Sequence, residues 1–407
     1  MKKRVLSLVL AAAMAASLTA CGGSEGAEQT TAAEAGKTEA ADAGSSGQEA
    51  ADGTVWKIGS MGPLTGPNAI YGNAVVNGAQ VAVDEINAAG GINGYQIEYK
   101  GADDESDAEK SINAYNSLKD WGMQILVGAT TSNSCIAVAA KSAQDNLFQI
   151  TPSGSAVECA ENPNVFRVCF SDPDQGAASA KYIGEHKLAT KVAVIYDSSD
   201  VYSSGIYSKF AAEAANQGLE IVAEEAFTAD TNKDFTTQLQ KAKDAGAELV
   251  FLPFYYTEAA LVLSQANTMG WDPIFFGCDG MDGILGVKNF DTSLAEGLML
   301  LTPFAADAAD DLTVNFVTTY KEKYGDTPIQ FAADAYDAVY AVKAAIEDAG
   351  ATPDMSVSDI CEAMKASMVK VSVDGLTGAG MTWNADGEPS KAPKAVKIEN
   401  GAYVSME

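Results

Sequence analysis

From residue 55 onward, short apolar runs alternate with longer amphipathic stretches. The apolar runs predict buried strands, and stretches with apolar residues three or four positions apart predict helices with one buried face. In the first part of the chain we expect strands at 55–60, 95–100, 124–127 and 148–151, and helices at 71–89, 108–120 and 136–146. Alternation of this kind is typical of a parallel sheet.

The same alternation restarts after an apolar segment at 165–171. The expected strands are 191–196, 220–226, 249–254, 273–277 and 298–301, and the expected helices are 175–186, 202–217, 235–245 and 257–269. Three more helices, at 312–324, 333–349 and 357–368, precede small antiparallel strands at 381–383 and 394–398. Two successive strand–helix runs predict an α/β protein with two doubly wound sheets, each covered by helices on both faces.

Small hydroxyl residues fill the turn 128–135, between an expected strand and the helix expected at 136–146. Ser and Thr favour helix starts because their oxygens accept hydrogen bonds from N–H groups of the first turn. The remaining N–H groups, with the positive end of the helix dipole, suit a small anion such as a carboxylate. Since ligands bind at the carboxyl ends of strands in open α/β sheets, the turn is either an ordinary capped turn or part of a ligand site.

Arg167 is the only arginine outside the first few residues. It falls at the expected crossing between the two sheets, where a structural ion pair is favoured over a ligand contact. A carboxylate ligand would therefore be held by hydroxyls, backbone N–H groups and helix ends, or by a lysine or Arg167.

The first 53 residues differ in composition from the rest. Lys2, Lys3 and Arg4 precede an apolar stretch at 5–17, as in a secretory signal segment, and this stretch is too short and wrongly flanked to be a spanning helix. Leu18-Thr-Ala-Cys21 resembles a bacterial lipobox. We therefore expect a lipoprotein signal peptide over 1–20 and lipidation of Cys21, with an ordinary signal peptide as the alternative. The polar composition predicts a disordered linker over 21–53.

The charge of the chain restricts its partners. With 26 basic and 55 acidic residues, its net charge is −29 at pH 7, which repels nucleic acid and anionic lipid. No later apolar run is long enough to span a bilayer. We expect an extracytoplasmic protein, anchored to the outer face of the bacterial cytoplasmic membrane or periplasmic, that does not bind nucleic acid.

Candidate catalytic and metal sites are few. His186 is the only histidine, and the sequence contains no nucleophile-elbow, phosphate-loop or dinucleotide-binding motif. The acidic run 103–107 precedes an expected helix, so capping is favoured over cation binding. We expect no catalytic residue, no metal and no cofactor, and hence not an enzyme.

The cysteines beyond Cys21 are scattered and lack the spacing of a zinc site or a disulfide framework. They are Cys135, Cys159, Cys169, Cys278 and Cys361. Small buried thiols are favoured, and a Cys159–Cys169 bridge is the alternative.

An ordered series of motifs over essentially all of 54–407 resembles the branched-chain amino acid binding proteins of ABC transporters. The motifs include Gly62-Pro-Leu-Thr-Gly66, Tyr71-Gly72, Glu85-Ile-Asn-Ala-Ala-Gly-Gly-Ile92, Asp103-Asp104, Val127-Gly128, Thr151-Pro-Ser153, Asn164-Val-Phe-Arg167, Asp197-Ser-Ser-Asp-Val-Tyr202 and Gly277-Cys-Asp-Gly280. The resemblance implies a type I periplasmic-binding fold, with two α/β lobes joined by three crossings. The first lobe would comprise 54–171 and 303–376, and the second 172–302 and 377–407.

The resemblance also implies a role for particular residues in a cleft between the lobes. The α-carboxylate of an amino acid would meet Ser132 and Ser155, and its α-ammonium would meet the Ser153 carbonyl, the Ser155 hydroxyl and Asp279. Many family members have Glu where this chain has Asp279, so the shorter side chain leaves the distance to the ammonium open.

Aromatic residues would form the walls of the same cleft. Tyr71, Tyr202 and Tyr255 match wall positions, with Tyr256 as the alternative to Tyr255, and Phe331 is a weaker candidate. Thr130 and Thr131 stand where some relatives have an apolar residue and a disulfide-forming Cys. Neither that disulfide nor the side-chain specificity of those relatives is therefore carried over.

The resemblance implies a binding protein that delivers leucine, isoleucine or valine to the permease subunits of an ABC importer. A monomer is the simplest expectation, because one acceptor site needs only one donor. One alternative keeps the fold but binds a short amide, a urea-like compound or an aromatic acid. Another is a ligand sensor that reports to a membrane partner.

Overall fold

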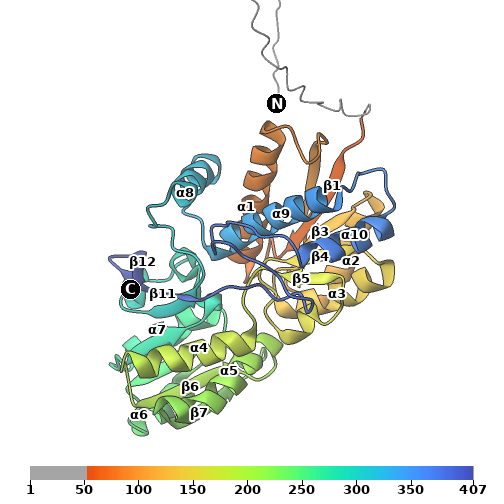
Figure 1. Ribbon diagram of the computed structural model, residues 1–407. Helices are drawn as coiled ribbons and strands as arrows, with labels where there is room; N and C mark the ends of the chain where they lie inside the picture. Colours follow the sequence, from red (N-terminus) through yellow and green to blue (C-terminus); the bar gives the residue numbers. More distant parts are fainter. Residues whose placement is uncertain (1–52, 407) are drawn as a thin grey trace, which may run out of the picture. The chain divides into compact units, whose positions relative to one another are not determined.

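The computed structural model describes residues 53–406. The expected signal peptide and Cys21 lie outside this range, as does the expected linker apart from Gly53. Two separate sheets organise the described residues (Figure 1). We call the five-stranded sheet with its helices lobe 1 and the seven-stranded sheet with its helices lobe 2.

The sheet of lobe 1 is parallel throughout and has the order β2-β1-β3-β4-β5. Its strands are β1 (Trp56–Gly62), β2 (Ile97–Asp103), β3 (Ile125–Val127), β4 (Phe148–Thr151) and β5 (Val165–Arg167). Its helices are α1 (Ala69–Ala88), α2 (Ala108–Asp120), α3 (Ser132–Asp145), α8 (Asp311–Tyr324), α9 (Gln330–Ala349) and α10 (Val357–Met368). The last three come from the C-terminal part of the chain, and α9 packs along α1.

The sheet of lobe 2 has the order β12-β11-β10-β9-β8-β6-β7. Its strands are β6 (Lys191–Asp197), β7 (Glu220–Phe227), β8 (Leu249–Leu252), β9 (Ile274–Gly277), β10 (Met299–Thr302), β11 (Lys394–Glu399) and β12 (Ala402–Met406). Strands β6 to β10 are parallel, and β11 and β12 add an antiparallel edge. The helices are α4 (Asp172–Glu185), α5 (Val201–Ala214), α6 (Thr236–Asp244) and α7 (Tyr256–Thr268).

Short 3-10 helices occupy some of the connections. They are η1 (Val157–Ala160), η2 (Ala215–Gln217), η3 (Asp279–Met281), η4 (Ile284–Gly286) and η5 (Thr292–Ala295).

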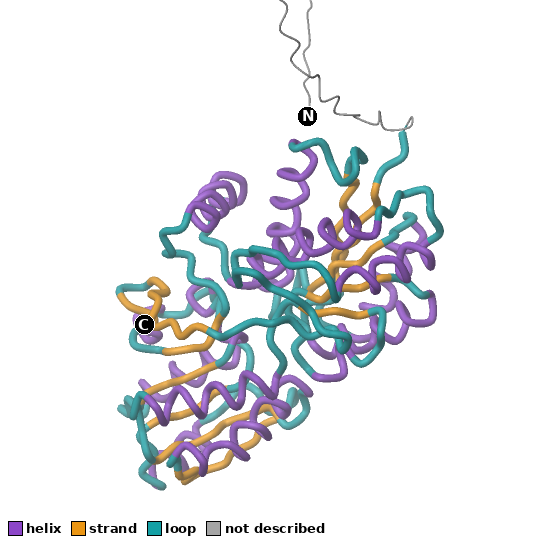
Figure 2. Tube along the Cα trace, in the orientation of Figure 1, coloured by secondary structure: helices purple, strands orange, loops and turns teal. Residues whose placement is uncertain are grey.

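Apolar residues on both faces of the strands explain why helices cover each sheet on two sides (Figure 2). In β3, Ile125 and Val127 belong to one buried cluster, whereas Leu126 between them belongs to another. Successive side chains of a strand point to opposite faces, so a continuous apolar run needs cover on both. The predicted α/β class with two helix-covered sheets is confirmed.

Several predicted details differ from the structure. Helix α3 begins at Ser132 rather than at 136, so part of the hydroxyl-rich turn is its first helical turn, and the N-cap residue Thr131 makes no side-chain capping bond. By contrast, the Asp107 carboxylate caps α2 by accepting from the N–H groups of Glu109 and Lys110. The predicted capping role of the acidic run is confirmed for this residue.

The third crossing between the lobes lies later than predicted. We expected the second lobe to resume at 377, with a strand at 381–383. Instead Thr377 donates to the Asp337 carboxylate of α9, and the indole N–H of Trp383 donates to the Arg167 carbonyl at 2.7 Å. Residues 381–383 form only isolated bridges, and the chain joins the sheet of lobe 2 at β11. Because residues 377–383 are hydrogen-bonded to lobe 1, they do not pair with the sheet of lobe 2, and the predicted boundary at 377 is too early.

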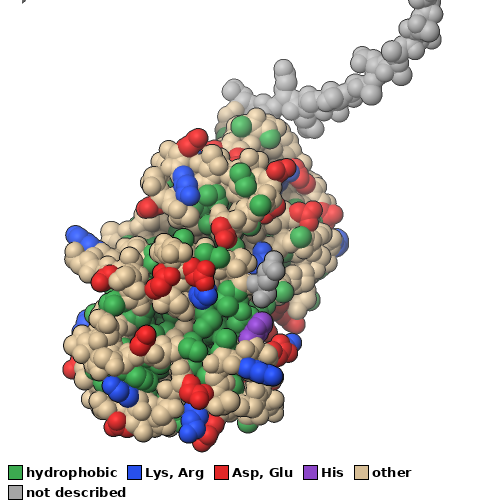
Figure 3. Space-filling model, turned by 90° about the vertical axis from the view of Figure 1, so that its left-hand side faces the viewer, with side chains coloured by type: hydrophobic (Ala, Val, Ile, Leu, Met, Phe, Trp, Pro, Cys, Tyr) green, Lys and Arg blue, Asp and Glu red, His purple; other side chains and the backbone are tan. Residues whose placement is uncertain are grey.

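All five cysteines in the described residues are buried free thiols, so the Cys159–Cys169 alternative is not formed. The charged side chains on the face of the molecule in Figure 3 are spread over it, with acidic groups interspersed among basic ones. No helix between residues 53 and 406 is long and apolar enough to cross a membrane.

Candidate functional site

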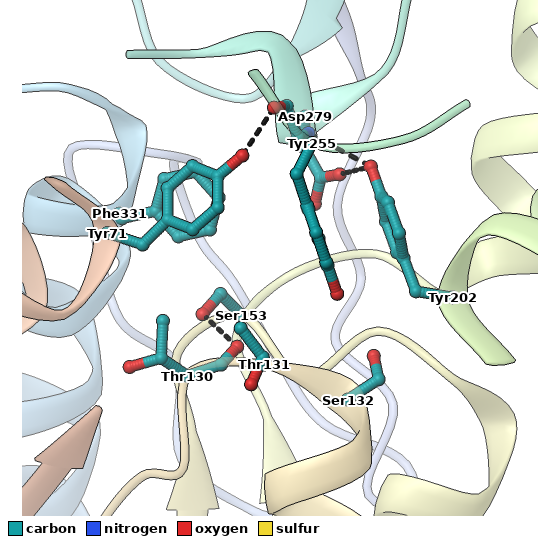
Figure 4. Close-up of a pocket in the computed structure, with 10 residues that line it drawn as sticks. Tyr71, Thr130, Thr131, Ser132, Ser153, Tyr202, Tyr255, Asp279 and Phe331 are labelled. Carbon is teal, nitrogen blue, oxygen red and sulfur yellow. Dashed lines mark hydrogen bonds between the residues drawn. The ribbon is translucent and has the colours of Figure 1, made fainter. Parts of the chain in front are cut away.

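A pocket of about 230 Å³, part of it open to solvent, lies between the lobes. Lobe 1 contributes the turn after β3, the loop after β4 and side chains of α1 and α9. Lobe 2 contributes α5, the start of α7 and the turn after β9. The lining residues are Tyr71, Thr130, Thr131, Ser132, Ser153, Tyr202, Tyr255, Asp279, Gly280 and Phe331 (Figure 4). The structure thus brings together all the predicted ligand-binding residues except Ser155 and Tyr256.

Hydroxyl groups and backbone amides form the lobe 1 side of the pocket. The Ser132 hydroxyl accepts from the N–H groups of Ser155 at 3.3 Å and Ala156 at 3.2 Å, and the Ser153 hydroxyl donates to the Thr130 carbonyl at 2.7 Å. These bonds fix the turn after β3 against the loop after β4. Because Ser132 begins α3, the N–H groups and positive dipole end of that helix are at the pocket. This side suits an anion.

Ser155 does not line the pocket, but its N–H donates to the Ser132 hydroxyl that does. Its hydroxyl is buried and makes no hydrogen bond within residues 53–406. It lies beside the Asp172 carboxyl, whose pKa is raised well above its usual range by burial. Asp172 and Gln175 on α4, which were not predicted, do not line the pocket but contact predicted residues: the Asp172 N–H donates to the Ser155 carbonyl, and Gln175 accepts from the Asp279 N–H.

Arg167 holds the loop after β4 from behind. Its guanidinium donates to the carbonyls of Gly154 and Ser155, the latter at 2.6 Å, and pairs with Glu388 at 3.2 Å. The side chain is fully buried and does not line the pocket. The predicted ion pair is therefore present, and Arg167 positions the loop.

A single carboxylate marks the lobe 2 side. The Tyr202 hydroxyl donates to Asp279 Oδ1 at 2.6 Å and accepts from the Gly280 N–H at 2.9 Å, while the Asp279 N–H donates to Gln175 at 3.2 Å. Burial raises the pKa of Asp279 to about 7, the Tyr202 hydrogen bond opposes this rise, and the charge of Asp334 adds to it. No Lys or Arg is among the lining residues. This side therefore suits a cation.

Aromatic rings separate the two polar sides. Tyr71 lies 4.3 Å from Phe331 and 5.7 Å from Tyr255 between ring centroids, and Tyr255 stacks on Tyr202 at 5.0 Å. The Thr130 hydroxyl donates to the Met61 carbonyl, and Figure 4 shows its methyl group directed toward the rings. Thr130 thus presents an apolar surface, although its side chain carries a hydroxyl.

Gly280 lines the pocket but was not predicted as a site residue, although it ends a motif noted in the sequence. A Cβ at this position would lie 2.6 Å from the Tyr202 hydroxyl oxygen. The glycine therefore allows the tyrosine to reach Asp279. The need for glycine at this position is visible only from the contact between the turn after β9 and Tyr202.

The opposed polar sides and the aromatic walls describe a site for a small zwitterion with an apolar part. A model of the periplasmic binding protein family matches residues 55–402 of the chain. The chain belongs to this family.

Its relatives in the periplasmic binding protein family include named amino-acid-binding proteins. The chain is 32% identical to a Leu/Ile/Val-binding protein homolog of Brucella melitensis, over 86% of this chain and 93% of that protein. It is 30% identical to the leucine-, isoleucine-, valine-, threonine- and alanine-binding protein of Pseudomonas aeruginosa, over 79% and 84% of the two chains.

A solved structure has the same fold. The branched-chain amino acid transporter substrate-binding protein LivJ of Streptococcus pneumoniae, in complex with isoleucine, is 30% identical with a TM-score of 0.77. The match covers 86% of this chain and all of LivJ. The fold is therefore that of type I periplasmic binding proteins.

No group of histidine, cysteine and acidic side chains within residues 53–406 could hold a metal ion. Asp103, in the acidic run, instead accepts from the N–H of Leu64 at 2.8 Å.

The Tyr202 hydroxyl should control the ionisation of Asp279. Replacing Tyr202 with Phe removes a hydrogen bond to the charged carboxylate, so we expect the pKa of Asp279 to rise above about 7. A carbon-13 NMR titration of labelled aspartate carboxyls would measure this shift. The variant Tyr340→Phe, which loses a hydroxyl bonded to Glu85 within lobe 1, is the control. An unchanged Asp279 titration in Tyr202→Phe would contradict the assignment.

Proposed function

We propose that this chain is an extracytoplasmic substrate-binding protein of an ABC importer, which binds a zwitterionic amino acid between its lobes and delivers it to permease subunits. The observation that carries the proposal is the placement of the Asp279 carboxylate and the first turn of α3 on opposite sides of one tyrosine-lined pocket. The names of the relatives support the same substrate class.

In this proposal the ligand carboxylate is held by the Ser132 hydroxyl and N–H groups at the start of α3, with Ser155 bonded to that hydroxyl through its own N–H. The ammonium is held by Asp279 and the Ser153 carbonyl. Charge-assisted hydrogen bonds of this kind contribute roughly 1.5–3 kcal/mol each. The rings of Tyr71, Tyr255 and Phe331 and the Thr130 methyl then surround an apolar side chain, which favours leucine, isoleucine or valine.

A pocket that holds both charged groups of an amino acid needs no chemistry to perform its task, and we propose that the chain is not an enzyme. A search for turnover of bound leucine tests this point. Release of unaltered leucine is expected, and any product formed in proportion to the protein would contradict it.

A thermal-shift screen of residues 54–407 against the twenty amino acids, urea, short amides and benzoate tests the function. A ligand that binds only the folded state stabilises it by about 2.7 kcal/mol at a hundredfold excess over Kd. We expect shifts with leucine, isoleucine and valine, and a loss of most of that shift in Asp279→Ala. Shifts only with amides or benzoate would replace the substrate, and undiminished amino-acid binding in Asp279→Ala would refute its role.

Binding should also depend on pH through Asp279. Its pKa is raised to about 7, and only the ionised carboxylate attracts an ammonium group. Lowering the pH from 8 to 6 protonates Asp279, so we expect leucine affinity to fall about tenfold. Calorimetric titration across this range measures the effect. The matched variant Asp279→Asn should bind more weakly and with a flat profile; a wild-type slope in that variant would assign the dependence to another group.

We further propose that Cys21 is lipidated and that the polar segment after it tethers the lobes to the outer face of the membrane. Mass spectrometry of the protein expressed with its leader should find a diacylglycerol-modified N-terminus at Cys21. The variant Cys21→Ala should be found in the soluble fraction. Cleavage at another residue without acylation would favour an ordinary signal peptide.

A further inference from the structure

Tyr256 is turned away from the pocket and contacts lobe 1. Its hydroxyl donates to the Pro67 carbonyl at 2.8 Å and accepts from the Ile70 N–H at 3.2 Å. The next residue, Thr257, donates from its hydroxyl to the same Pro67 carbonyl at 3.0 Å. The first turn of α7 in lobe 2 thereby binds the start of α1 in lobe 1.

Helix α1 lacks a cap from its own sequence. Its N-cap residue, Asn68, makes no side-chain capping bond, and the Ile70 N–H is one of the first-turn amides that has no acceptor within the helix. Tyr256 supplies this acceptor from the other lobe. The capping bond can therefore form only when the two lobes lie together.

Apolar packing lies beside these hydrogen bonds, at the contact between the start of α1 and lobe 2. The Ile70 side chain lies against two glycines of lobe 2, because a Cβ at Gly283 or Gly286 would lie 3.0 or 3.1 Å from its methyl carbons. Larger residues at these positions would keep the start of α1 away from lobe 2.

Tyr71 connects this contact to the pocket. Its hydroxyl donates to the Gly280 carbonyl and accepts from the Tyr256 N–H at 3.3 Å, and its ring lines the pocket. A pocket wall of lobe 1 is thus bound to two backbone groups of lobe 2.

We propose that Tyr256, with Ile70 as its packing partner, forms a latch that stabilises the closed arrangement of the lobes without touching the ligand. The effect on amino-acid binding rests on the function proposed above, whereas the latch itself does not. An interaction present only in the closed form raises apparent affinity by increasing the fraction of protein that is closed. It should act on ligand release, because the latch forms only after the lobes meet.

Stopped-flow measurement with L-leucine on the full folded region tests the latch. Loss of one hydrogen-bonding hydroxyl in Tyr256→Phe should raise koff and Kd about two- to tenfold and leave kon nearly unchanged. Ile70→Ala should act in the same direction by removing the packing. Tyr340→Phe, which loses a hydroxyl bond inside lobe 1, should match the wild type. Values for Tyr256→Phe equal to those of Tyr340→Phe would overturn the proposal.

A second measurement needs no ligand and separates the latch from the proposed function. The Ile70 N–H is hydrogen-bonded to Tyr256 of the other lobe. Its hydrogen exchange can be measured by NMR in leucine-free protein. The exchange should be faster in Tyr256→Phe than in wild type or Tyr340→Phe. Equal Ile70 exchange rates in all three proteins would overturn the latch. If no amino acid binds to the wild type, the proposed function fails, and the exchange result alone decides the latch.

Discussion

The Asp279 carboxyl is buried between the lobes with one hydroxyl donor, Tyr202, and no basic side chain among the residues that share its pocket. A buried carboxylate without a counter-charge is unfavourable, and the rise of its pKa to about 7 reflects that cost. An ammonium group would supply the missing counter-charge, and the carboxylate of the same amino acid would then need hydrogen-bond donors of its own. The rest of the site supplies these donors at the start of α3.

The anion side is built differently from the cation side. No basic side chain faces the pocket there, because Arg167 lies behind the loop after β4 and its donors are directed to the carbonyls of Gly154 and Ser155. The arginine orients the loop while backbone N–H groups and hydroxyls face the pocket. A free arginine in the cleft would form an ion pair with Asp279 and compete there with the ammonium group of the proposed ligand. With Arg167 bound to backbone carbonyls, Asp279 has no such competitor.

Much of this site follows from local sequence. The hydroxyl-rich residues after β3 were predictable as a candidate site because strand ends of an open α/β sheet define where a ligand binds. The resemblance to a family added Asp279 and the tyrosines. The exact start of α3 was not predictable, since several residues of the turn 128–135 carry hydroxyls and each could cap a helix. The late third crossing depends on hydrogen bonds from Thr377 and Trp383 to lobe 1, which no local pattern encodes.

Tyr256 shows most clearly what sequence could not provide. Two adjacent tyrosines occur at the end of one loop, and either could have faced the ligand. The start of α7 separates them: Tyr255 precedes the helix and stacks on Tyr202, whereas Tyr256 is its first residue and points to the other lobe. The side chain of Asn68 does not cap the start of α1, and the Ile70 N–H there donates instead to the Tyr256 hydroxyl of the other lobe. Since Tyr71 belongs both to that contact between the lobes and to the pocket, ordering of the wall around a ligand and docking of the lobes favour each other.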